Sequence, residues 1–323
     1  MNSLEKIVLN KRLPVLFIGS GIPKRYLNDF PNWNELLKES FNKVNPDPFY
    51  IGKYMDSLKR KNLSDFEKNK ELGSIIEDEF NKAFYDRKIT IGDPKKTSWV
   101  TRGISPYKMF IKERLTNLEI KQNNTLNKEL QELSLLKNKV AAVITTNYDT
   151  FIEDYILGNG YTVFTKQHEL FSKESYNFSE LYKIHGSIND VETIIITEQD
   201  YESFNNSRKL FIAKMLTLFT ESPIIFLGYS FTDENIRQII VDFLTCLTEE
   251  QLKNINDNFV FITYEKDTQE LIESKRIIIT ENGKDIPITE IKTDNFLKVY
   301  QTLNKLIPGM TPKNIREIGR AHV

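Results

Sequence analysis

Short runs of consecutive apolar residues, rich in β-branched and aromatic side chains, constrain this chain more than any other feature. The clearest lie at residues 15–18 (VLFI), 140–144 (VAAVI), 193–196 (TIII), 224–227 (IIFL) and 259–262 (FVFI). A strand with one face in water alternates apolar and polar residues, whereas a strand in a parallel sheet covered on both faces is apolar throughout. The runs therefore predict buried, parallel strands.

Helical patterns lie between some of these strands. In residues 233–247, apolar side chains recur at helical spacing and form one stripe. Thr232 or Asp233 can cap the N-terminus of this helix. Strands that alternate with helices predict an α/β fold, here a Rossmann-like doubly wound parallel sheet.

The stretch between the first two strands is too long for one crossover helix. Apolar side chains keep helical spacing in two parts of it, at residues 72–84 and 126–136. We interpret residues 32–138 as a large helical insertion into the sheet domain. Residues 1–270 would then form one domain.

Beyond residue 270 the pattern weakens. RIIIT and IPITEI read as two short strands, and NFLKVYQTLNKLI reads as a final helix. The tail after it has no clear structural pattern. We therefore interpret residues 271–323 as a C-terminal extension, or as a linker cut short from a longer protein.

Charge and cysteine content exclude several classes of function. The 44 basic and 45 acidic residues give a net charge of −1, and no long basic block favours nucleic acid or an anionic membrane surface. Cys246 is the only cysteine, which predicts an intracellular, cytoplasmic protein without disulfides. With three histidines besides, we expect no metal site. No apolar run approaches the roughly 20 residues that span a bilayer.

Glycine or polar clusters follow four strand candidates. They are Gly19-Ser20-Gly21, residues 145–149 (TTNYD), residues 183–187 (KIHGS) and residues 228–233 (GYSFTD). In an open parallel sheet, ligands bind outside the carboxyl ends of the strands, and a glycine turn there aims N–H groups at phosphates. Together the clusters predict a nucleotide site.

Each cluster also has a simpler explanation. The glycine pair lacks the third glycine of the dinucleotide pattern, since Lys24 stands there, so it can be a plain turn. Asn147 or Asp149 can be a helix cap. A lone His185 is more often structural than catalytic, although histidine suits proton transfer near neutral pH. Residues 228–233 can be an ordinary strand–helix junction.

The order of the motifs GSGIP, FPNWNELL, TTNYD, KIHGS, ITEQDY and FLGYSFTDENI resembles that of bacterial sirtuin-like (silent information regulator-like) domains. The branch it resembles most occurs in anti-phage defence proteins. The resemblance covers roughly residues 13–265, without the helical insertion and the tail. It implies a site that binds NAD as substrate and needs no metal.

The resemblance also implies a role for individual residues. Gly19, Ser20 and Gly21 match the loop that holds the NAD phosphates. Asn147 matches the catalytic asparagine near the nicotinamide ribose, and His185 matches the catalytic histidine. The remaining matches are to residues expected to bind NAD: Thr146 and Asp149 in the asparagine motif, and Gly228, Tyr229, Ser230 and Asp233 in the loop on the adenosine side.

Departures from the family pattern narrow the range of activities that the resemblance implies. Sirtuin deacylases carry a four-cysteine zinc module, which one cysteine cannot build. Their arginine-bearing loop is replaced by PKRYLNDFPNWNELL, which places Arg25 nearby and Pro23 where the family often has serine. The defence branch hydrolyses NAD to nicotinamide and ADP-ribose, so the resemblance favours an NADase. The alternatives are a module that senses NAD or ADP-ribose without turnover and an NAD-dependent protein deacylase.

An enzyme that depletes NAD would harm its own cell if it were always active. We therefore expect an effector of abortive infection that is gated by assembly as a homo-oligomer, or by a further domain or partner protein that senses infection. The helical insertion is one place where such a signal could act.

Overall fold

The structure is a computed structural model that describes residues 1–92, 98–158, 161–171, 179–207, 209–229, 240–241, 258–279 and 285–307. Most of the predicted helix 233–247 lies outside these residues. The predicted site residues Ser230 and Asp233 lie outside them as well.

Eight strands of the described residues form one sheet in the order β3-β4-β2-β1-β5-β6-β8-β7. Their bounds are β1 (Val15–Ile18), β2 (Ala142–Thr145), β3 (Tyr161–Phe164), β4 (Ser179–Lys183), β5 (Ile224–Leu227), β6 (Phe259–Tyr264), β7 (Ile272–Ile279) and β8 (Asp285–Thr293). Every neighbouring pair is parallel except β7 and β8, which are antiparallel. The predicted α/β fold with a mostly parallel sheet is confirmed.

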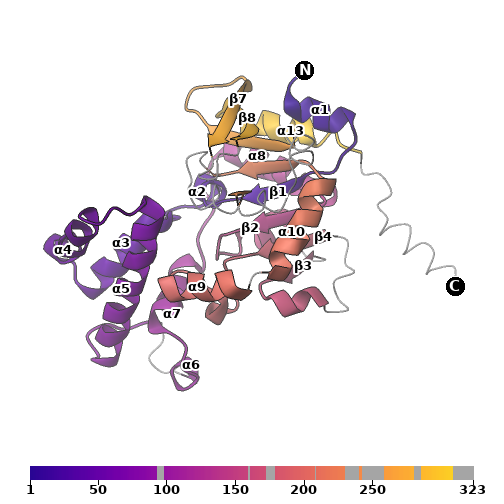
Figure 1. Cartoon of the computed structure of the whole chain (residues 1–323). Helices are drawn as coiled ribbons and strands as arrows, with labels where there is room; N and C mark the ends of the chain where they lie inside the picture. Colours follow the sequence, from indigo (N-terminus) through magenta and orange to yellow (C-terminus); the bar gives the residue numbers. More distant parts are fainter. Residues whose placement is uncertain are drawn as a thin grey trace.

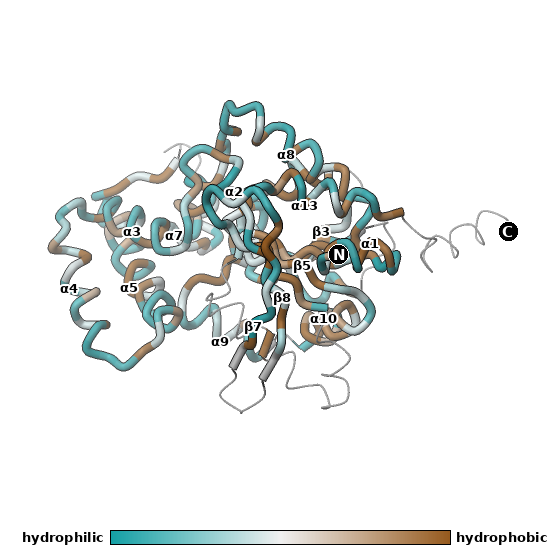
Figure 2. Tube along the Cα trace, turned by 90° about the horizontal axis from the view of Figure 1, so that it is seen from above, coloured by the Kyte–Doolittle hydropathy of each residue, from teal (hydrophilic) through white to brown (hydrophobic). Residues whose placement is uncertain are grey.

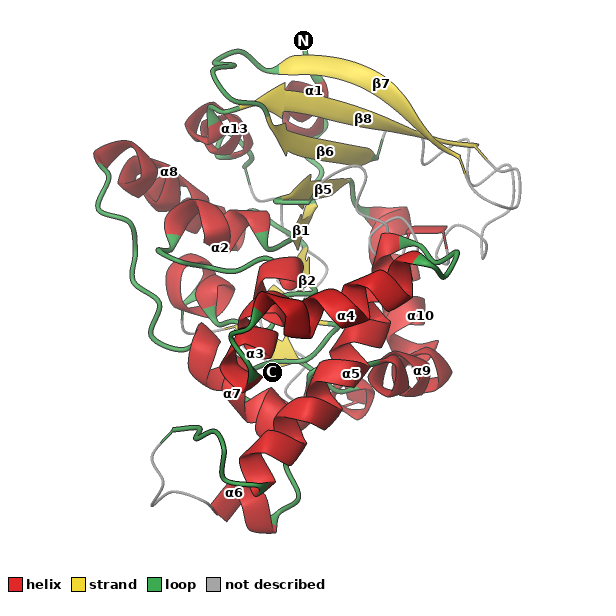
Figure 3. Ribbon diagram, turned by 90° about the vertical axis from the view of Figure 1, so that its left-hand side faces the viewer, coloured by secondary structure: helices red, strands yellow, loops and turns green. Residues whose placement is uncertain are grey.

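Both faces of the sheet are covered, as the continuous apolar runs require. In β1, Leu16 and Ile18 join the core that includes α1 (Ser3–Leu9) and α13 (Phe296–Leu303), while Val15 and Phe17 join the core under α10 (Lys209–Glu221). Figure 3 shows helices on both sides of the strands, and Figure 2 shows hydrophobic residues concentrated in the strands at the centre. This two-sided burial is the pattern of a doubly wound sheet.

The long connection from β1 to β2 is helical, as the spacing of its apolar residues indicates. Its helices are α2 (Gly21–Tyr26), α3 (Trp33–Val44), α4 (Pro48–Lys59), α5 (Asp65–Tyr85), α6 (Ser98–Thr101), α7 (Pro106–Leu115) and α8 (Asn124–Ser134), followed by the 3₁₀ turn η1 (Leu135–Asn138). Figure 1 shows α3 to α7 gathered into a lobe beside the sheet, whereas α8 lies against the sheet near α13. Side-chain capping boxes at Asn32 and Ser64 start α3 and α5.

Residues 272–279 and 285–293 join the same sheet. β7 and β8 form the two predicted strands, and α13 forms the predicted final helix over residues 296–303. Buried Val299, Tyr300 and Leu303 of α13 pack into the core on one face of the sheet. The segment expected as an extension therefore adds strands and a helix to the sheet domain.

One predicted strand is wrong. Residues 193–196 do not pair with a strand: the 3₁₀ turn η5 (Val191–Thr193) ends there, and an irregular segment leads to α9 (Glu198–Ser207). Ile194 and Ile196 are buried, which produced the strand-like pattern. The backbone groups of Ile194 and Ile196 bond to side chains and to the preceding turn, and that of Ile195 bonds to the loop after β4, so burial alone misled the interpretation.

Candidate functional site

The register of the central strands brings their carboxyl ends to one edge of the sheet. Ile18 at the end of β1 pairs with Thr145 of β2 and with Leu227 of β5, and Thr145 pairs with Lys183 of β4. The clusters that follow these strands therefore leave the sheet side by side. This is the edge at which open α/β sheets bind ligands.

A cavity of ≈ 570 Å³ lies at this edge. Its volume is within the range of about 300–1,000 Å³ that is typical of small-molecule and cofactor sites. On the sheet side, the cavity is lined by Ser20, Thr146, Asn147, Tyr148, Asp149, His185 and Tyr229. Six of these are residues that the sequence predicted for the site, Tyr148 being the exception.

Most of the remaining lining comes from the helical insertion and from α9, and the sequence analysis assigned it no role. Its polar and aromatic residues are Asn32, Trp33, Asn34, Ser64, Asp65, Phe66, Asn69 and Tyr201. Trp33, Phe66 and Tyr201 form an aromatic cluster with ring centroids 5.3–6.2 Å apart. The signal was present, because Trp33 lies in FPNWNELL and Tyr201 in ITEQDY, both motifs of the sirtuin-like pattern.

The predicted glycines meet one another rather than the cavity. A Cβ added at Gly21 would lie 2.7 Å from the Gly228 carbonyl oxygen, and one at Gly228 would lie 2.5 Å from the Ile22 nitrogen. The Gly21 N–H donates to the Gly228 carbonyl at 3.0 Å. The glycines, Gly19 included, let the turns after β1 and β5 pack closely, which leaves Ser20 and Tyr229 on the cavity wall.

A hydroxyl network joins the turns after β1, β2 and β5. The Tyr229 hydroxyl donates to the Ile18 carbonyl at 3.1 Å and lies 2.9 Å from Thr146 Oγ1. Thr145 Oγ1 donates to the same carbonyl at 2.6 Å and accepts from the Asn147 N–H at 3.0 Å. These bonds fix the backbone that carries Asn147.

Asn147 and Asp149 each keep a buried polar atom without a partner. Asn147 is 9% exposed and its Nδ2 has no hydrogen bond; Asp149 is 4% exposed and its Oδ2 has none either. Asp149 Oδ1 accepts from the Phe151 N–H at 2.9 Å, so this residue also caps the next turn. Unsatisfied buried polar atoms are rare, and beside a cavity they mark positions that a bound polar ligand can satisfy.

The Asp149 carboxyl has an unusual charge environment. Burial raises its pKa to about 6, against the opposing effect of the Lys183 ammonium and with a further increase from Glu153. Lys183 is fully buried and donates to Glu153 Oε1 at 2.8 Å and to the Asp149 carbonyl. At neutral pH the carboxyl is therefore mostly ionised, and it places negative charge at the cavity wall.

His185 is held in a buried, aromatic setting. It is 3% exposed and meets the rings of Tyr201 and Phe204 edge to face, with centroids 5.4 and 5.6 Å away. Gly186 follows it with a φ of +90°, where a Cβ would lie 2.1 Å from the Thr193 carbonyl oxygen. Only glycine fits this turn, which explains why glycine follows the histidine in the KIHGS motif.

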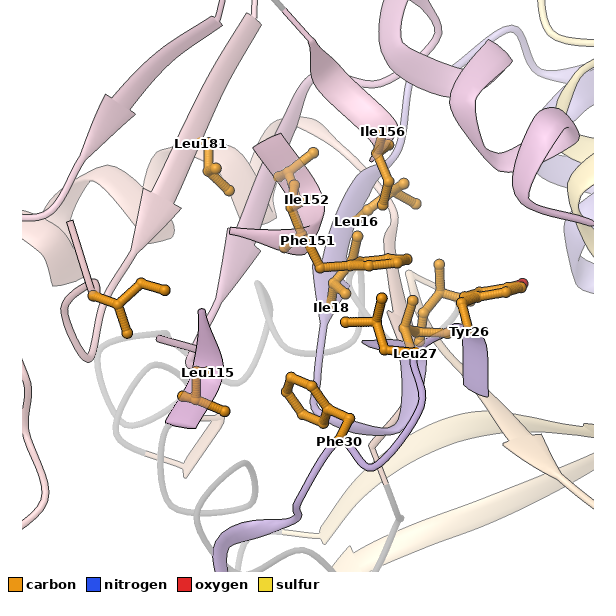
Figure 4. Close-up of a cluster of buried hydrophobic side chains, with 14 of the residues drawn as sticks. Leu16, Ile18, Tyr26, Leu27, Phe30, Leu115, Phe151, Ile152, Ile156 and Leu181 are labelled. Carbon is orange, nitrogen blue, oxygen red and sulfur yellow. The ribbon is translucent and has the colours of Figure 1, made fainter. Parts of the chain in front are cut away.

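Arg25 and Pro23 do not line the cavity. Arg25 pairs with the buried carboxylate of Glu129 at 2.7 Å, donates to the Asp294 carbonyl at 2.8 Å and stacks over the Phe296 ring. Pro23 is buried in the first turn of α2, where its missing N–H costs nothing. Figure 4 shows the hydrophobic core beside this turn, with Phe30 near Leu27 and Ile18.

Two kinds of feature are absent from the described residues. No group of three or more His, Cys, Asp or Glu side chains in this part of the chain could hold a metal ion. No helix among these residues has the length and apolar character needed to cross a membrane.

This chain is similar in sequence to known proteins. The family model of the SIR2-like domain matches residues 141–280, which include Asn147, Asp149, His185 and Tyr229. NAD(+) hydrolase ThsA from Enterococcus faecium is 24% identical over 98% of this chain and 62% of its own length. The chain thus spans 62% of that relative.

Shorter matches point the same way. NAD(+) hydrolase ThsA from Acinetobacter baumannii (strain 532279) is 31% identical over 33% of this chain and 22% of its own length. Defense-associated sirtuin 2 from Bacillus subtilis is 28% identical over 33% of this chain and 11% of its own length. The predicted resemblance to sirtuin-like defence proteins is confirmed.

Proposed function

We propose that this chain, whose residues 141–280 match the family model of the SIR2-like domain, is an NAD+ hydrolase of anti-phage defence that releases nicotinamide and ADP-ribose. The observation that carries the proposal is the cavity at the carboxyl edge of the sheet, which brings Asn147, Asp149 and His185 to one wall. The relative that matches 98% of this chain and a second that matches 33% of it are both named NAD(+) hydrolase.

The proposed reaction suits these side chains. The leaving nicotinamide departs from a cationic pyridinium as a neutral molecule, and positive charge develops on the ribose, as in other glycoside cleavages. Asn147 can orient the ribose hydroxyls or the attacking water through its amide. His185, in its neutral form, can accept a proton from that water, and general base catalysis of this kind contributes about 10²–10⁴-fold.

Asp149 can act through its charge. Its pKa of about 6 leaves the carboxylate mostly ionised at neutral pH, and its Oδ2 is free of protein partners. A buried negative charge favours both the cationic nicotinamide of the substrate and the positive charge of the transition state. The neighbouring Thr146, Ser20 and Tyr229 line the same wall and would contact the rest of the dinucleotide.

Regulation and location are further parts of the proposal. An always-active NADase would deplete the NAD of its own cell, and we propose a cytoplasmic location, which the single cysteine favours. We propose that turnover requires a homo-oligomer, or a sensing domain or partner. Measuring molecular mass in solution together with turnover tests this, since full turnover by a monomer alone would contradict it.

Two variants test the site. Asn147→Ala and His185→Ala are each expected to lower nicotinamide release by about 10²-fold or more while the protein remains folded. His168→Ala, at an exposed histidine outside the cavity, is the matched control and should retain full activity. Unchanged turnover in both site variants would refute the assignment.

The same assay separates the other functions. A sensing module would be thermally stabilised by NAD or ADP-ribose without forming product. A deacylase would release nicotinamide only when an acylated peptide is present.

A further inference from the structure

The segment 194–197, between η5 and α9, connects both predicted catalytic motifs. The Ile195 N–H donates to the carbonyl oxygen of His185 at 3.0 Å. The Ile195 carbonyl accepts from the hydroxyl of Tyr148, the residue between Asn147 and Asp149, at 2.6 Å. We call residues 194–197 the clasp segment, because it holds the backbone of one motif and a side chain of the other.

An ion pair fastens the clasp segment to the helical insertion. Lys108 of α7 donates to the Ile194 carbonyl at 2.8 Å and to Asp200 Oδ1 at 2.6 Å. The other oxygen of Asp200 accepts from the N–H groups of Ile196 and Thr197, each at 3.1 Å. The side chains of Lys108 and Asp200 are 11% and 20% exposed, so water and salt screen this pair less than a pair on the open surface.

Helix α5 holds the same segment from a second direction. A Cβ added at Gly73 would lie 2.3 Å from the Ile196 carbonyl oxygen, so the helix backbone lies directly against the segment. The hydroxyl of Ser74 accepts from the Glu198 N–H at 3.0 Å. Two helices of the insertion therefore contact the clasp segment, at Ile194 and at Ile196.

We propose that Lys108 and Asp200 are positioning residues, which hold the clasp segment and through it the catalytic geometry of His185 and Asn147. The effect on turnover rests on the proposed NAD hydrolysis. Neither residue lines the cavity, so each acts through the clasp segment. The same contacts give the insertion a physical route to the site, because a shift of α5 or α7 moves the backbone to which His185 is bonded.

The test compares two variants of one helix. Lys108→Met removes the ion pair at the clasp segment. Arg114→Met, also on α7, removes the pair with Glu39 at 2.5 Å and the bond to the Asp29 carbonyl, which do not touch the segment. Misplacing catalytic groups by about 1 Å costs up to about 10²-fold. We therefore expect Lys108→Met to lower kcat by roughly 10- to 100-fold with KM nearly unchanged, and Arg114→Met to leave kcat unchanged.

A second readout does not depend on activity. The chain has three histidines, so the ring signals of His185 can be assigned by NMR through His185→Ala. We expect Lys108→Met to shift the His185 ring signal and Arg114→Met to leave it in place. If the wild type releases no nicotinamide, the proposed function fails while this comparison still tests the positioning role.

Two results would show that Lys108 and Asp200 do not position the site. A His185 signal that is unchanged in Lys108→Met, or an equal loss of kcat in the two variants, would overturn the proposal. Asp200→Asn keeps the shape of the side chain and weakens the pair. If Lys108→Met does not fold, Asp200→Asn carries the test with the same expected shift.

Discussion

The buried carboxyl of Asp149 gives the most quantitative prediction. Its pKa rises from the ordinary 3.8 to about 6 because the side chain is withdrawn from water. The folded protein therefore binds this proton more tightly than the unfolded chain does. The contribution of Asp149 to the free energy of unfolding falls as the pH rises from about 4 to about 6, and it stays low above that range.

The magnitude follows from the two pKa values. One pH unit corresponds to about 1.4 kcal/mol, so ionising Asp149 in the folded protein costs about 3 kcal/mol. Asp149→Asn removes this cost and keeps the acceptor for the Phe151 N–H. Its amide nitrogen takes the place of the partnerless oxygen, which costs about 1 kcal/mol. The variant should be more stable than the wild type by about 2 kcal/mol at about pH 7.5.

Urea unfolding of both proteins across this pH range measures the difference. Other carboxylates titrate alike in the two proteins, so their effects cancel in the comparison. The difference in the free energy of unfolding should be zero near about pH 4.5, favour the wild type by about 1 kcal/mol well below that pH, and favour the variant by about 2 kcal/mol above about pH 6. A difference that is independent of pH, or a variant less stable than the wild type at neutral pH, would refute the reasoning.

Two further predictions follow from single residues outside the cavity wall. Gly186→Ala should lower the free energy of unfolding by at least about 2 kcal/mol, because Gly186 has a φ of +90° and an added Cβ would lie 2.1 Å from the Thr193 carbonyl oxygen. Thermal denaturation measures this loss. Arg25→Met should cost about 3–5 kcal/mol by leaving the Glu129 carboxylate, 2% exposed, without its partner. The folded fraction should keep its nicotinamide-releasing activity, and a selective loss of turnover would mean that Arg25 reaches the substrate.

The central strands could be predicted because their sequence leaves little choice. VLFI and IIFL form β1 and β5 at the predicted residues, since each run is apolar throughout and ends at a glycine. β3 was missed, and β4 was expected only as a strand candidate without bounds before KIHGS. Three of the four residues of β3 are partly or fully exposed, so this edge strand carries no continuous apolar run.

The run at 193–196 was predicted as a strand but does not form one. Ile194 and Ile196 are as buried as strand residues, but Lys108, Tyr148 and Asp200 satisfy the backbone there. These partners lie elsewhere in the chain or beyond the run, and no local pattern reveals them. Burial could be predicted from the sequence, whereas the partner of each N–H and carbonyl could not.

The candidate site divides in the same way. Its sheet wall could be predicted, because parallel strands bring the residues after them to one edge, and Asn147, Asp149 and His185 lie there. The wall from the insertion depends on how α3 and α5 pack over that edge. Trp33 and Phe66 reach the cavity through this packing, which helical periodicity alone does not determine.

The most direct measurement is the product analysis of the purified chain incubated with NAD alone. The account predicts that nicotinamide and ADP-ribose form in equal amounts without an acylated peptide, and that His185→Ala abolishes their formation. Binding of NAD that stabilises the protein without forming nicotinamide in any assembly state would contradict it.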